Sequence, residues 1–182
     1  MTVVGHMNRE VAQLVAVIDQ AFNKTSWHGT NLRGSLRRVT AAQAAWRPSP
    51  HRHNIWEIAV HAAYWKYAVA RRFTGGARGS FATFGLRSGH PEPSRGTLKG
   101  SNWFRRPDSD GAPRDAAWKA DIDLLDDMHD TLRGVVLRLS AQDLARTPPG
   151  KKVNNFAILS GIAAHDLYHA GQIQLLKRLQ SR

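Results

Sequence analysis

Cysteine is absent from this chain of 182 residues. Disulfide bonds, thiolate metal sites and cysteine nucleophiles are therefore excluded. No apolar run approaches the roughly 20 residues that a membrane-spanning helix needs, and the N-terminus lacks the basic start, apolar run and small-residue cleavage site of a secretory signal. We therefore expect a cytoplasmic protein that is not inserted in a membrane.

Acidic residues are scarce: the chain has 14 of them against 26 lysines and arginines, which gives a formal net charge of +12. No carboxylate lies between Gln20 and Trp56, and Glu92 is the only acidic side chain between Arg71 and Arg106. Aspartates are concentrated later, between Asp108 and Asp130. We expect one strongly positive end or face, which would attract nucleic acid, a phosphorylated substrate or an anionic thiol cofactor. A solvated basic surface is the plainer interpretation.

A hydrophobic content of 42% and a charged content of 22% are typical of a globular protein. Four long stretches have the apolar spacing of amphipathic helices, and no stretch shows a convincing strand alternation. These helices are expected to begin after Asn8, near Asn54, near Pro113 and after Asn154–Asn155, the second ending at about Phe73 and the fourth at about Leu179.

Shorter helical pieces are expected between the first two long helices. One lies around Leu32, Leu36 and Val39, and Thr40 to Gln43 has the pattern of a capping box that begins a brief helix. Pro48 and Pro50 would end this second piece.

The segment at about 74–112 is rich in glycine, serine, proline and arginine. It is far longer than the 2–8 residues that typically join antiparallel neighbours in a bundle. A 20-residue helix is about 30 Å long, a distance that this loop covers easily, so the second and third long helices are expected to run parallel. The sequence therefore predicts an all-α fold in one domain, residues 1–182: a four-helix bundle with long crossover connections.

Three histidines form a candidate metal site. His165 and His169 stand four residues apart in the last helix, so one turn presents both imidazole rings on the same face. His61 has the bundle-facing spacing of the second helix, together with Ile58 and Trp65. A ligand from one helix and an i, i+4 pair from another is an arrangement by which bundles hold metals. Three protein ligands with an open position are typical of catalytic rather than structural sites.

Plainer interpretations stand beside this one. Histidines that face a core can hydrogen-bond to each other, to Tyr64 or Tyr168, or to water. Asp166 invites comparison with the H-E-x-x-H metalloproteases, but the helical pattern disfavours that class, and we interpret Asp166 as a helix-packing group or a neighbour of the ligands. His129, on the inner face of the third helix, could be a fourth ligand or a proton shuttle, although a core histidine is preferred. Surface positions are expected for His28, His51, His53 and His90.

Several motifs together resemble one known family. The most specific is the run G-I-A-A-H-D-L-Y-H-A-G-Q-I at residues 161–173, followed by H-N-I-W-E-I-A-V-H at 53–61. Trp27-His28-Gly29, Asn102-Trp103-Phe104 and Trp118 also fit. On these residues the chain resembles the DinB/YfiT-like family of bacterial four-helix-bundle proteins.

The resemblance implies a bundle with crossover connections, commonly a homodimer. It also implies a nickel- or zinc-type site formed by His61, His165 and His169. Some members of the family are thiol-dependent transferases or isomerases, and others are metal-dependent hydrolases without a known substrate. The family's name refers to induction by DNA damage, which suggests a stress response and says nothing of DNA binding.

The favoured hypothesis is an enzyme whose divalent metal, zinc or nickel, activates water or a low-molecular-weight thiol for attack on an electrophile. Guanidinium groups pair bidentately with carboxylates, so arginines near the loop are candidates to hold an anionic cofactor: Arg71, Arg72, Arg105 and Arg106. Aromatic candidates to line the pocket are Trp56, Trp65 and Tyr168.

The alternative is a basic stress protein that binds nucleic acid or another polyanion and has a structural or vestigial metal site. Its support is the net charge and the pair Trp103 and Phe104, whose rings could stack on bases. No recognised nucleic-acid-binding motif is present.

Overall fold

The computed structural model describes residues 8–75, 81, 102–104, 106 and 115–181. Four long helices form the body of the molecule: α1 (Arg9–Phe22), α4 (Ile55–Thr74), α5 (Asp115–Val136) and α7 (Asn155–Gln180). Three short ones lie between them: α2 (Leu32–Ser35), α3 (Ala41–Ala45) and α6 (Ala141–Ala145). The prediction of an all-α fold is confirmed for these residues. Pro113 and most of the loop predicted at 74–112 lie outside them.

The helix starts follow from local hydrogen bonds that the sequence encodes. The side chains of Asn8, Asn54 and Asn154 accept backbone N–H groups of the first turns of α1, α4 and α7. Thr40 and Gln43 form the predicted capping box of α3. A second capping box, between Ser140 and Asp143, begins α6, a helix that the apolar spacing did not predict because it is too short to show a period.

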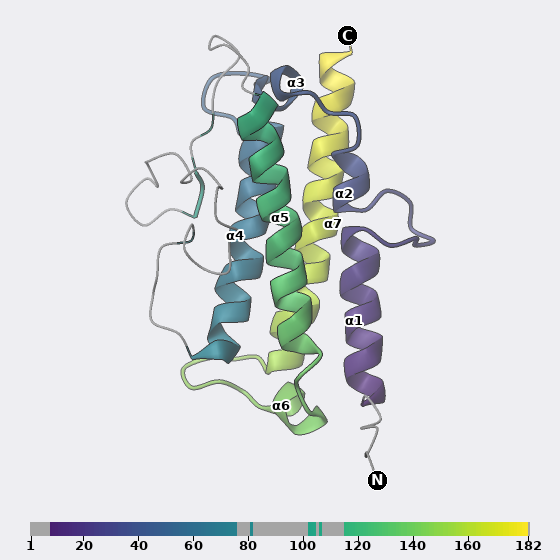
Figure 1. The fold of residues 1–182 in the computed structure, drawn as a ribbon, viewed down its shortest axis with the longest axis vertical. Coiled ribbons are helices and arrows are strands. Elements are labelled where there is room, and N and C mark those ends of the chain that lie inside the picture. The colour runs from purple at the N-terminus through teal and green to yellow at the C-terminus, as the bar shows by residue number, and fades with distance from the viewer. Residues whose placement is uncertain (1–7, 76–80, 82–101, 105, 107–114, 182) are drawn as a thin grey trace.

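Helix direction sets the topology (Figure 1). α1 and α7 run in one direction along the bundle, and α4 and α5 run in the other. α4 packs against both α5 and α7, and α1 packs against α7 and α5, so each long helix has two neighbours. The parallel arrangement of α4 and α5 requires the chain between them to return along the bundle, as the length of the loop predicted. Gly75 ends α4 in a left-handed conformation with φ of 69°.

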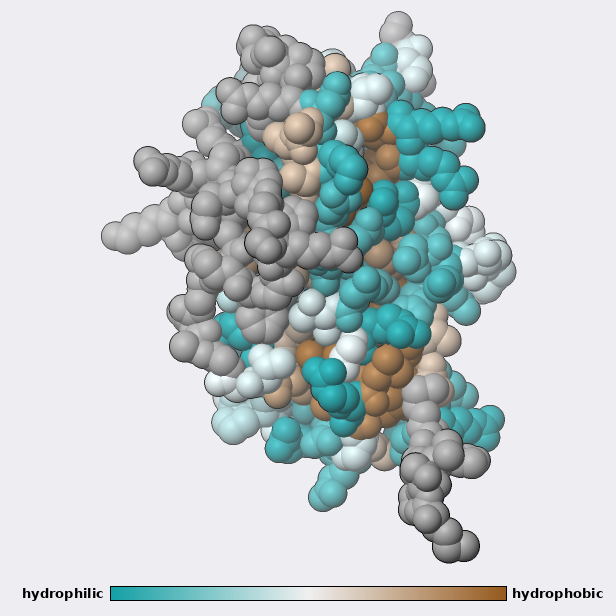
Figure 2. Space-filling view, in the orientation of Figure 1, coloured by the Kyte–Doolittle hydropathy of each residue, from teal (hydrophilic) through white to brown (hydrophobic). Residues whose placement is uncertain are grey.

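Apolar residues fill the interior in two clusters. One surrounds the fully buried Trp56, and the other includes Leu14, Ile18, Leu132 and Leu159. On the face shown in Figure 2, hydrophobic residues reach the surface only as narrow strips between hydrophilic ones. No helix in the described ranges has both the length and the apolar character that crossing a bilayer requires.

Candidate metal centre

His61 of α4 meets His165 and His169 of α7 inside the bundle. His61 and His169 are buried, and His165 is half-buried. One donor nitrogen from each ring lies within 4.8 Å of the other two. The Nε2 atom of His165 is 3.3 Å from that of His61 and 3.0 Å from that of His169. The structure therefore brings together all three residues that the spacing singled out.

Two of the three distances between these nitrogens fit a shared metal ion, and the third, between His61 and His169, is at most 4.8 Å. Imidazole nitrogens bind zinc at about 2.0–2.1 Å, so two ligands at an angle of about 90–109° are separated by about 2.8–3.4 Å. Both distances from the Nε2 atom of His165, 3.3 Å to His61 and 3.0 Å to His169, fall in this range. Two neutral imidazoles that turn lone pairs toward each other repel, and a cation between them removes this repulsion.

Carbonyl oxygens fix the tautomers of two of the rings. The Nδ1 atom of His61 is 2.9 Å from the backbone oxygen of Asn102, and that of His169 is 2.6 Å from Oε1 of Gln172. Carbonyl oxygens only accept, so each Nδ1 carries the hydrogen and donates it. The lone pairs are then left on the Nε2 atoms that converge, which is how neighbouring groups orient ligating histidines in metal sites.

Burial keeps the three rings neutral. It lowers the pKa of His165 to about 3, with the neighbouring His169 and His61 adding to the effect. It lowers the pKa of His169 to about 4, against the hydrogen bond that His169 donates to Gln172. Burial also lowers the pKa of His61, against its hydrogen bond to Asn102. Neutral imidazole is the form that binds metals, so the site is ready to bind a cation at neutral pH.

Trp103 covers one side of the site. Its ring lies between those of His53 and His61, with centroids 3.6 Å and 3.8 Å away and planes within 7° and 5° of parallel. The backbone of the preceding residue, Asn102, holds His61. Residues 102–104 therefore bring a distant part of the chain onto the candidate metal centre, and Phe104 is buried beside Tyr64.

Arg47 and Glu57 form a series of polar contacts that ends at His53. Glu57 accepts two hydrogen bonds from the guanidinium of Arg47, at 2.9 Å and 2.5 Å, and its Oε2 lies 3.0 Å from Nδ1 of His53. Since the carboxylate accepts, Nδ1 of His53 donates, and in the neutral ring the lone pair is then on Nε2. His53 is exposed, as expected, but it also contacts the ring that covers the site.

A groove of about 540 Å³ opens beside the histidines. His169 and Gln172 line it together with His53, Trp103 and leucines of α7. We call it the α7 groove. His169 is one of its lining residues, so the groove adjoins the candidate metal centre.

His129 and Asp166 are packing groups and lie outside the set of three. His129 stacks on Phe22 at 3.9 Å, and its Nε2 lies 3.2 Å from a carboxylate oxygen of Asp19, so the preferred interpretation as a core histidine is confirmed. Asp166 forms an ion pair with Lys66 of α4, and both side chains are fully buried. It thus joins α4 to α7, as the helix-packing interpretation held.

The arginines predicted to hold an anionic cofactor do not gather at this site. Arg106 is buried, and its guanidinium donates to Asp121 at 2.7 Å and 3.1 Å, so that prediction is wrong for Arg106. Arg71 and Arg72 begin ten residues after His61, about 15 Å along α4. Arg105, like His90, lies outside the described residues.

The predicted aromatic residues divide between core and site. Trp56 is fully buried and donates from Nε1 to Asp121 at 2.6 Å, so it belongs to the core. Trp65 contacts His61 and His165 edge-on, with centroids 6.3 Å and 6.2 Å away. Tyr168 is exposed and lines the α7 groove.

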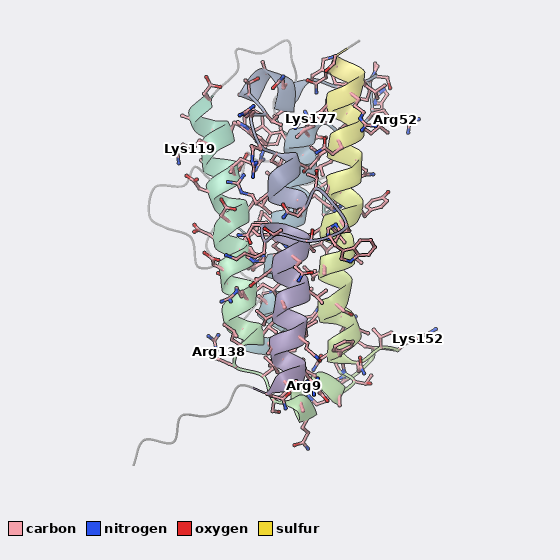
Figure 3. The ribbon with its side chains drawn as sticks, turned by 90° about the vertical axis from the view of Figure 1, so that its right-hand side faces the viewer. Arg9, Arg52, Lys119, Arg138, Lys152 and Lys177 are labelled. Carbon is pink, nitrogen blue, oxygen red and sulfur yellow. The ribbon has the colours of Figure 1, made fainter. Side chains whose placement is uncertain are left out.

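Neither the Trp103 and Phe104 rings nor the labelled basic side chains form the surface that was expected of a nucleic-acid-binding protein. Both faces of the Trp103 ring are covered by histidines, and Phe104 is buried, so neither ring is open to stack on a base. The basic side chains labelled in Figure 3 lie toward both ends of the bundle, not at one: Arg52 and Lys119 toward one end, Arg138 and Lys152 toward the other.

Sequence reasoning missed the groups that orient the ligands. Gln172 stands three residues after His169, one helical turn on, and this spacing was the available signal. Nothing in the spacing predicts the contact of Asn102 with His61, since a backbone carbonyl from a position 41 residues away has no sequence signature.

Comparison with known proteins gives one match. The family model for the DinB superfamily matches residues 24–173, which include all three histidines. No curated protein and no solved structure matches the chain. The matched range covers most of the sequence and both helices that provide the candidate ligands, and the chain therefore belongs to the DinB superfamily.

Proposed function

We propose that the protein is a metal-dependent enzyme in which His61, His165 and His169 hold one divalent ion, zinc or nickel. The observation that carries this proposal is the convergence of three Nε2 atoms, two of them left as lone-pair donors by carbonyl oxygens on the opposite ring nitrogens. Three protein ligands leave a position open, toward the α7 groove that His169 lines.

A divalent ion held by these three histidines would act as a Lewis acid and lower the pKa of a water or thiol, which makes that group nucleophilic near neutral pH. Residues of this chain orient the ligands and enclose the site. Asn102 and Gln172 hold the imidazole rings, and Trp103 covers His61 on one side. The apolar leucines of the groove exclude bulk water from one side of the substrate.

We propose that His53 takes up the proton of the water or thiol through a water molecule in the groove, since the Trp103 ring lies between its imidazole and that of His61. Glu57 orients its ring by accepting from Nδ1, which leaves the Nε2 lone pair as the acceptor. His53 and His169 line the same groove. A positioned general base contributes typically about 10²–10⁴-fold to the rate.

The test is turnover by the full-length protein expressed with added zinc or nickel. The substrates are activated esters with water alone, and electrophiles such as epoxides and alkyl halides with glutathione or another low-molecular-weight thiol. We expect one of these reactions to be catalysed, to be lost with a chelator and to return with the metal. His165→Ala is expected to abolish it, and His53→Gln to lower kcat about 10²–10⁴-fold with metal content unchanged.

His28→Gln is the matched control, because His28 is an exposed histidine outside the groove and is expected to leave the rate unchanged. Turnover that survives both the chelator and His165→Ala would contradict the proposal. If the His53→Gln variant keeps the wild-type rate, His53 is not the proton acceptor.

A further inference from the structure

The α7 groove extends well beyond the histidines. On the outer side of the C-terminal half of α7, Tyr168, Leu175 and Leu179 expose 64%, 58% and 39% of their surface. Helices of soluble bundles usually place polar side chains on the face that is turned away from the core. Here one face of α7 along the groove is formed by residues three or four positions apart: Tyr168, Gln172, Leu175 and Leu179. Three of these four residues have large apolar or aromatic side chains.

Most residues that line the groove are apolar, but its polar side chains are not confined to one end. His169 and Gln172 lie beside the candidate metal centre, Ser49 and Arg52 also line the groove, and Leu179 follows His169 by ten residues, about 15 Å along the helix. Ile58 and Trp103 line the groove together with the leucines. Its volume, about 540 Å³, is within the range of about 300–1,000 Å³ that is usual for small-molecule sites.

We propose that this groove binds an unbranched alkyl or acyl chain of the substrate, with the reacting group of that substrate at the three histidines. The substrate class is then an amphiphile with a polar head and an apolar chain up to about 15 Å long. The identity of the head group rests on the proposed function. Binding of the chain rests on the groove alone, and it does not require the metal.

The experiment measures chain binding without turnover. Metal-free full-length protein is titrated by calorimetry with 1-butanol, 1-hexanol, 1-octanol and 1-decanol, which are neutral and need no ligand position. We expect the dissociation constant to fall about fourfold for each added methylene, the ratio that about 0.8 kcal/mol represents at 25 °C. Leu175→Glu is expected to weaken binding of 1-octanol and 1-decanol at least about tenfold and to leave 1-butanol nearly unchanged.

Leu137→Glu is the matched control, because Leu137 is also an exposed leucine, 37% accessible, and lies outside the groove. It is expected to leave the whole series unchanged. Affinity that is independent of chain length, or equal losses in the two variants, would overturn the inference. So would a dimer in sedimentation that Leu175→Glu dissociates, since the face would then be an interface between copies. None of these results bears on metal binding, so this inference and the proposed function fail separately.

Discussion

At the scale of single residues, neutral histidines in the interior are the most consequential feature of this protein. Burial lowers the pKa of His165 to about 3 and of His169 to about 4. His129 follows the same rule outside the candidate site: burial and the nearby charge of Lys66 lower its pKa to about 3. A neutral ring suits His165 and His169 to bind a cation. At His129 the lowered pKa makes the stability of the fold depend on pH.

His129 is expected to make the folded protein less stable in acid. In the unfolded chain it binds a proton below about pH 6.5, and in the folded protein only below about pH 3. The unfolded state therefore holds more protons between these values, and stability falls as the pH falls through this window, by at most about 1.4 kcal/mol per pH unit. We expect His129→Gln to reduce the slope of unfolding free energy against pH, measured by urea denaturation of metal-free protein from pH 4 to 7. An unchanged slope would show that His129 does not contribute.

At the scale of elements, α7 carries most of the candidate chemistry. It provides His165 and His169, the outer stripe of the groove, and Asp166, whose side chain pairs with Lys66 of α4. The two helices that carry the candidate ligands are therefore also joined by a buried ion pair. The helix starts were predictable because asparagine caps and capping boxes are local. α6 was missed, and its capping box between Ser140 and Asp143 was the signal available.

Breaking the ion pair between α4 and α7 is expected to be costly. Asp166→Asn or Lys66→Met leaves a buried group without its partner, and we expect each to lower the free energy of unfolding by about 3–5 kcal/mol. Replacing both, as Lys66→Met with Asp166→Leu, is expected to recover most of the loss. Urea denaturation of metal-free protein measures all three.

The exposed pair of Lys119 and Asp123 is the matched comparison, with side chains 76% and 44% accessible. Lys119→Ala is expected to change stability by less than about 1 kcal/mol. Equal effects at the buried and exposed pairs would contradict the account of α4 and α7.

At the scale of the whole molecule, the bundle and its parallel α4 and α5 followed from helix periods and one long loop (Figure 1). The set of His61, His165 and His169 was also predictable, because spacing fixes which face of a helix each side chain occupies. What could not be predicted depends on contacts between distant segments: Trp103 over His61, and Arg106 with Asp121. A net charge of +12 likewise indicates neither where the basic side chains lie nor what they pair with.

The most direct test of the account is the metal content of tag-free protein after expression with added zinc or nickel. Three converging nitrogens predict about one ion per chain, and His61→Ala, His165→Ala and His169→Ala are each expected to reduce this to less than about a tenth. His28→Ala, the exposed control, is expected to retain the full content. Wild-type protein with less than about a tenth of an equivalent, or His165→Ala with unchanged content, would contradict the central claim.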